Sequence, residues 1–160
     1  MLFRSVKIGS LGRYNAAKAY SPFNRFVLGG DGLSNNGSGQ VGQEVLALRG
    51  YARGDFPNSL NGGATTFAKY TTELRYPISL NPSATIYGTA WLEAGNSWNN
   101  LRDFNPFNVK RAAGVGLRVH LPMFGTLGFD YGLGFDKDIK TPNKLTGYGA
   151  FNIILGFEPD

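Results

Sequence analysis

Residues 126–136 read TLGFDYGLGFD, and apolar side chains occupy every second position of this stretch. Successive side chains of a β-strand point to opposite faces, so the alternation predicts a strand with one apolar face and one face of glycine, threonine and aspartate. Such a strand requires lipid or a protein core on one side only. The apolar face comprises Leu127, Phe129, Tyr131, Leu133 and Phe135.

The same alternation recurs along the chain and predicts an all-β fold. The alternating runs are close to the roughly 9 to 11 residues of a tilted strand that spans a membrane. No run has the pattern of a helix or of a continuous apolar span. The expected strands are residues 2–11, 67–76, 85–95, 109–121, 126–136 and 147–157.

The connections between these runs alternate between long and short. In outer-membrane β-barrels the periplasmic turns are short and the extracellular loops are long. The alternation therefore predicts part of an antiparallel transmembrane β-barrel whose chain ends on the periplasmic side. The expected connections are residues 12–66, 77–83, 97–108, 122–125 and 137–146.

The composition agrees with such a fold and excludes some others. The chain has 160 residues, a formal net charge of +5, 23 glycines and no cysteine, and its mean hydropathy is −0.20. Half of each membrane-spanning strand is polar, so a barrel has a low hydropathy, whereas the lack of a run of about 20 apolar residues excludes helical spans. The absence of cysteine excludes a disulfide framework.

Six strands are too few to close a barrel by themselves. Bacterial single-chain barrels begin at about 8 strands, and an open edge in hydrocarbon leaves unpaired N–H and C=O groups. The residues after Met1 also lack the features of a secretory signal. We therefore expect residues 1–160 to be the C-terminal part of an outer-membrane β-barrel domain, with a long loop at residues 12–66. Periplasmic repeats and earlier strands are expected to lie outside this chain.

Four segments carry a resemblance to one family. Residues 48–51 (LRGY) resemble the Val-Arg-Gly-Phe/Tyr motif at the tip of the sixth extracellular loop of the BamA-type outer-membrane assembly family, which includes the two-partner secretion transporters. In that family the loop folds back into the barrel lumen. Residues 26–30 (FVLGG) are similar to the aromatic-x-x-Gly-Gly segment upstream of the motif. Residues 72–77 (TELRYP) and 92–98 (LEAGNSW) are similar to the two strands that follow it.

The resemblance points to a site inside the barrel. Alternation places the carboxylates of Glu73 and Glu93 on the lumenal faces of neighbouring strands, where they would stay uncompensated unless a cation reached them. The planar guanidinium of Arg49 can pair with carboxylates, and Gly50 permits a tight turn beside it. In the family the equivalent arginine contacts acidic residues at these strand positions. The resemblance therefore implies a lumenal latch of Arg49, Gly50, Tyr51, Glu73 and Glu93.

The end of the chain resembles the recognition signal on the family's last strand, which forms one side of a seam with the first strand. Residues 151–156 read FNIILG, and the tail 157–160 (FEPD) replaces the usual terminal aromatic residue. An edge strand can pair with a new strand through its free backbone groups. The expected seam strand carries Phe151, Ile153, Leu155, Gly156 and Phe157.

The resemblance implies a factor that assembles and inserts β-barrel proteins into the bacterial outer membrane. Its partners would be outer-membrane lipid, nascent β-barrel proteins and periplasmic lipoprotein subunits of an assembly complex. Two alternatives are a protein-secretion transporter of the same superfamily and a passive porin or surface-antigen barrel. A soluble lipocalin-like binder is a further alternative, and it would need the apolar faces inside the barrel.

Other classes of function lack support in the sequence. Residues 37–42 (GSGQVG) match a nucleotide-binding pattern in letters only, because no strand precedes them and no βαβ unit surrounds them. His120 is the single histidine and has no clustered ligands, so we expect no metal. The sequence has no G-x-S-x-G nucleophile motif, and we expect neither enzymatic activity nor a cofactor. Lysine and arginine are scattered, so we expect no nucleic-acid partner.

Overall fold

The computed structural model describes residues 1–15, 20–21, 25–30, 44–56, 58, 62–81, 84–122, 125–137 and 148–156. No helix among these residues is long and apolar enough to cross a membrane. The elements are β1 (Leu2–Ser10), β2 (Phe26–Leu28), β3 (Glu44–Leu46), η1 (Arg53–Asp55), β4 (Thr66–Asn81), β5 (Ala84–Trp98), η2 (Leu101–Asp103), β6 (Lys110–Leu121), β7 (Gly125–Gly134) and β8 (Gly149–Gly156).

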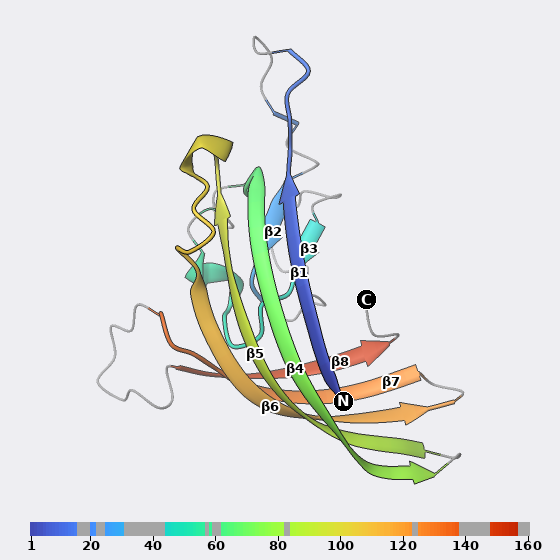
Figure 1. The fold of residues 1–160 in the computed structure, drawn as a ribbon. Coiled ribbons are helices and arrows are strands. Elements are labelled where there is room, and N and C mark those ends of the chain that lie inside the picture. Colours follow the sequence, from blue (N-terminus) through green and yellow to red (C-terminus); the bar gives the residue numbers. More distant parts are fainter. Residues whose placement is uncertain are drawn as a thin grey trace.

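Six strands form one antiparallel sheet in the order β1-β4-β5-β6-β7-β8. Apart from the segment that carries β2 and β3, each strand pairs with the next along the chain, and β1 and β8 lie at the two ends of the order. The sheet curves strongly, and β2 and β3 lie within its curve (Figure 1). This architecture confirms the all-β antiparallel fold predicted from the alternation.

The two faces of the sheet differ sharply in polarity. On the convex face Leu92 is 60% exposed and Leu117 is 39% exposed, whereas their sequence neighbours Glu93 and Arg118 are 3% and 2% exposed on the concave face. Alternation along each strand produces this difference. The exposed leucine, isoleucine and valine side chains of the strands point away from the concave interior, which contradicts the soluble lipocalin-like alternative. Exposed apolar side chains of the strands include Val6, Ile8, Leu74, Tyr76, Leu92, Val115, Leu117, Tyr131, Phe151 and Ile153.

The strand bounds differ from the predicted ones, most of all at Pro77. Proline lacks the N–H that a sheet uses, and the sequence predicted a connection at residues 77–83. β4 instead continues to Asn81, because the register shifts between Pro77 and Ser79 in a β-bulge that accommodates the proline. β5 begins at Ala84 and extends to Trp98, so β4 and β5 form a long hairpin whose strands are separated by only two residues of sequence.

The segment 12–66 contains strands that the sequence did not predict. β2 and β3 pair in parallel, with Val27 opposite Val45, and β2 packs against β4 and β5. Runs of three residues are too short to show a periodicity, which is why the pattern missed them. Phe26 and Leu28 are buried. The small ladder therefore anchors the long segment on the concave side of the sheet.

Candidate functional site

The loop tip, defined as residues 48–51, turns sharply on the concave face. Gly50 has a φ of +87°, a left-handed conformation that glycine adopts without strain. The Tyr51 N–H donates to the Leu48 C=O at 3.2 Å and closes the turn, and the Gly30 N–H donates to the Tyr51 C=O at 2.9 Å. The tip is therefore held by its own turn and by the upstream glycine segment.

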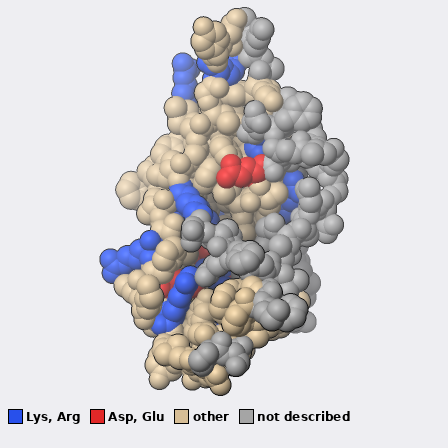
Figure 2. Space-filling view, turned by 90° about the vertical axis from the view of Figure 1, so that its right-hand side faces the viewer, with Lys and Arg blue, Asp and Glu red and all other residues tan. Residues whose placement is uncertain are grey.

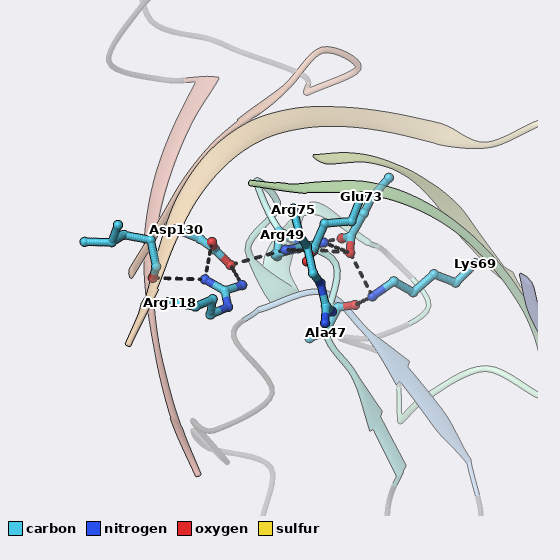
Figure 3. Close-up of polar contacts among 9 residues, drawn as sticks. Ala47, Arg49, Lys69, Glu73, Arg75, Arg118 and Asp130 are labelled. Atoms are coloured by element: carbon cyan, nitrogen blue, oxygen red, sulfur yellow. Dashed lines mark hydrogen bonds and ion pairs between the residues drawn. The ribbon is translucent and has the colours of Figure 1, made fainter. Parts of the chain in front are cut away.

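Arg49 reaches from the loop tip to carboxylates on β4 and β5 (Figure 3). Its Nη1 donates to Glu73 Oε2 at 2.9 Å. Its Nε and Nη2 lie 3.0 and 2.9 Å from Glu93 Oε1, and its backbone N–H donates to Glu93 Oε2 at 2.9 Å. All three side chains are buried. Hydrogen bonds between ionised groups are stronger than neutral ones, so this contact can hold the tip against the sheet.

Each of these two carboxylates also has a cation of its own on β4. Arg75 Nε lies 2.8 Å from Glu73 Oε1, and Lys69 Nζ lies 3.2 Å from Glu93 Oε1. Buried carboxylates are stable only when such partners compensate their charge. Glu73 and Glu93 are therefore compensated from within the sheet as well as from the loop.

A third carboxylate joins from β7. Asp130 is 0% exposed, and its Oδ2 lies 3.4 Å from Arg49 Nη1. Arg118 on β6 donates from Nη1 and Nη2 to the two oxygens of Asp130, each at 2.7 Å. We define the Arg49 cluster as Arg49, Lys69, Glu73, Arg75, Glu93, Arg118 and Asp130. Its four cations and three carboxylates give a formal net charge of +1.

Trp91 forms the floor beneath Arg49. The centroid of its ring lies 4.3 Å from the guanidinium carbon of Arg49, an attractive cation–π arrangement. Room for the indole comes from Gly114 and Gly132, which face each other across β6 and β7. A Cβ added at Gly132 would lie 2.5 Å from Trp91 Cη2 and 3.1 Å from the Gly50 nitrogen. The inward glycines of β6 and β7 therefore admit both the indole and the loop tip.

We expect Gly132→Ala to displace Trp91 and the loop tip. The added methyl group overlaps the indole, and such overpacking costs about 1–3 kcal/mol. Denaturant unfolding in lipid vesicles measures the loss, and amide hydrogen exchange of residues 44–56 reports on the tip. Gly88→Ala is the matched control, since its Cβ would meet Ile78 Cδ1 at 3.6 Å, an ordinary contact. Equal stability of the two variants would contradict this packing role.

Tyr51 secures the other side of the loop tip. Its hydroxyl donates to the Arg111 C=O at 2.7 Å and accepts from the Asp136 N–H at 2.9 Å. Its ring packs against Phe56 with the centroids 5.6 Å apart. Burial raises the pKa of Tyr51 to about 12. The phenol is therefore held in its neutral form, in which it can donate to a carbonyl.

We expect alkaline pH to undo this contact. The pKa of Tyr51 in the folded protein, about 12, exceeds the value of about 10 for an unfolded tyrosine. Its contribution to stability is therefore complete below about pH 10 and is lost as the pH rises through about 12. The tyrosinate absorbance of the wild type minus that of Tyr51→Phe measures this titration. A midpoint near pH 10 in this difference would show that the phenol is not buried.

The structure brings together the residues of the expected latch, with Arg49 against Glu73 and Glu93 and with Gly50 and Tyr51 on either side of the turn. The expected seam residues lie elsewhere, on β8. Phe151 and Ile153 are exposed on the convex face, and Leu155 and Gly156 pair with β7 through their backbones. Phe157 lies outside the described residues.

Sequence reasoning gave no role to Arg118, Asp130 or Trp91. Which inward side chains meet depends on the register between strands, and a period of two does not report register. Glycines opposite the charged residues were an available signal. Gly128 faces Arg118 and Gly116 faces Asp130 across β6 and β7, which leaves space for two charged side chains to meet diagonally.

The Omp85 superfamily domain matches residues 2–158. No curated protein and no solved structure matches the chain. The chain therefore belongs to the Omp85 superfamily. Proteins of this superfamily are outer-membrane β-barrel proteins, and membership indicates a part in protein insertion or secretion. The apolar convex face is accordingly the face that meets lipid.

Proposed function

We propose that this chain is part of a BamA-type factor that assembles and inserts β-barrel proteins into the outer membrane. The loop tip would be latched in the lumen by the Arg49 cluster. The main support is the buried contact of Arg49 with Glu73 and Glu93, because a passive porin or surface-antigen barrel would not need it. Superfamily membership supports the same class of function. The proposed role is mechanical rather than enzymatic.

β8 supplies the edge at which we propose that insertion occurs. It pairs with β7 and lies at one end of the sheet order among the described residues. Free backbone groups of an edge strand can template a further strand, a mode of binding known as β-augmentation. In the proposed cycle a weakly paired seam between β8 and the barrel's first strand opens, accepts a hairpin of a nascent barrel protein and releases the finished barrel.

The proposed partners are nascent β-barrel proteins, outer-membrane lipid and periplasmic lipoprotein subunits. The short connections after β4 and β6, and the longer ones after β5 and β7, support a periplasmic end for the chain. Lysine and arginine side chains are scattered over the visible face and do not gather into one patch (Figure 2). The described basic side chains on this face therefore form no stripe of the kind that binds nucleic acid.

The seam can be tested in the full-length protein reconstituted into lipid vesicles. One variant carries two cysteines, one in β8 and one in the barrel's first strand, so that oxidation forms a disulfide that locks the seam. Folding of an added denatured barrel protein is followed by its heat-modifiable gel mobility. The matched control carries Tyr131→Cys and Phe151→Cys, which face each other across β7 and β8. We expect oxidation to abolish insertion in the first variant only and reduction to restore it.

Undiminished insertion by the locked-seam variant would overturn this mechanism. Transport of a soluble polypeptide across the vesicle membrane, without any insertion of barrel proteins, would instead assign the secretion alternative.

A further inference from the structure

We propose that Asp130, held in place by Arg118, is a positioning residue that fixes Arg49 and ties the loop tip to β7. The inference rests on the proposed function, in which the tip is held inside the lumen. It adds a third strand to the attachment and connects the tip to the strand that pairs with the edge strand β8.

The contact between Asp130 and Arg49 is part of a chain of ion pairs, in which each of the two residues also has a second partner of opposite charge. Asp130 Oδ2 lies 2.7 Å from Arg118 Nη2 and 3.4 Å from Arg49 Nη1. The same Arg49 Nη1 lies 2.9 Å from Glu73 Oε2. One guanidinium nitrogen therefore stands between a carboxylate of β4 and a carboxylate of β7. The charges alternate in sign from Arg118 to Glu73 (Figure 3).

The Asp130 carboxylate has little freedom to move. A Cβ added at Gly116 would overlap Asp130 Oδ1, and one added at Gly128 would lie 2.9 Å from Arg118 Nη1. Gly116 and Gly128 lie so close to the Arg118–Asp130 ion pair that a side chain at either position would collide with it. Because Arg118 contacts both oxygens of Asp130, the carboxylate is oriented as well as confined. A fixed carboxylate can set the position of the arginine of the loop tip.

The position of Asp130 in the sheet connects its contact with Arg49 to the edge strand β8. Asp130 faces Asn152 of β8 in the register of the two strands, whereas Glu73 and Glu93 belong to the β4–β5 hairpin. Without Asp130, Glu73 and Glu93 would attach the loop tip only to the β4–β5 hairpin, which is separated from β8 by β6 and β7. Through Asp130, a movement of β7 during opening of the seam is transmitted to Arg49 and the loop tip.

The test separates the Asp130–Arg49 contact from the Asp130–Arg118 ion pair. Arg118→Gln removes the ion pair but leaves Asp130 available to Arg49. The double variant Asp130→Asn/Arg118→Gln removes one charge of each sign, keeps the cluster at +1 and deprives Arg49 of its third carboxylate. Amide hydrogen exchange of residues 44–56 is measured in the full-length protein in lipid vesicles. We expect roughly tenfold faster exchange in the double variant, the loss expected for one hydrogen bond between charged groups, and a smaller increase in Arg118→Gln, in which Asp130 keeps its charge toward Arg49 but loses the group that orients it.

Equal exchange in the two variants, whether both fast or both slow, would overturn the inference. If Arg118→Gln fails to fold, Gly116→Ala provides a second test, because it displaces the Asp130 carboxylate without altering any charge and should also expose the tip. In an Arg49→Gln background the Asp130→Asn/Arg118→Gln changes should have no further effect on residues 44–56. These exchange measurements hold whether or not the protein inserts barrels, so failure of the proposed function and failure of this inference give different results.

Discussion

Arg49→Ala is expected to release the loop tip from the sheet while the sheet itself stays folded. Arg49 contacts three buried carboxylates, and breaking a buried ion pair costs about 3–5 kcal/mol. We expect the loss to weaken docking of the loop tip rather than folding of the sheet, because Arg75 and Lys69 still pair with the two glutamates. Amide hydrogen exchange of residues 44–56 should rise at least about a hundredfold, the factor that corresponds to roughly 3 kcal/mol. Insertion in lipid vesicles should fall with it.

Arg102→Ala is the control for this substitution. Arg102 lies in η2, is exposed to solvent and belongs to a different connection of the sheet. Surface substitutions of this kind change stability by less than about 0.5 kcal/mol. If the two variants show the same exchange in residues 44–56, Arg49 does not hold the tip.

Leu117→Arg is expected to destabilise the protein in the membrane by about 2–4 kcal/mol, the cost of a cation on the lipid face of a barrel strand. Leu117 lies within β6 and points outward from the convex face, where no described side chain covers it completely. The cost arises because the guanidinium must leave water for hydrocarbon. Reversible denaturant unfolding in lipid vesicles measures it.

The matched control lies on the same strand with the opposite orientation. His120→Arg places the same cation on the concave face, where His120 is exposed and its ring nitrogen lies 3.1 Å from the Thr126 hydroxyl. We expect a much smaller loss of stability there, because the concave face is hydrated. A similar loss in both variants would contradict the assignment of the convex face to lipid.

The faces of the strands could be predicted from sequence because they follow from local alternation. Glu73 and Glu93 lie on the concave face, as the period of two predicted, and Leu92 lies on the convex one. The connection at Pro77 was wrongly predicted. A proline ordinarily ends a strand, and only the pairing of two strands reveals that a bulge can absorb it.

The partners of the loop arginine could be predicted only in part. The two glutamates were implied by a resemblance, whereas Asp130 is separated from Arg49 by 81 residues and meets it through the register of β6 and β7. The short strands β2 and β3 depend on packing against the sheet rather than on their own periodicity. Long-range register and packing are properties of the assembled fold, and a single sequence carries little direct signal for them.

Each carboxylate of the Arg49 cluster is paired with a cation on the sheet, and this pairing affects how the loop tip can leave. When Arg49 withdraws, Lys69, Arg75 and Arg118 still neutralise Glu93, Glu73 and Asp130 in one-to-one pairs. These three ion pairs are then formally neutral, and no buried carboxylate of the Arg49 cluster is left without a cation. Departure of the loop tip thus removes a single positive charge, that of Arg49. When the tip returns, the three carboxylates are still held in place by their cations on the sheet. We therefore expect docking of the loop tip to be reversible.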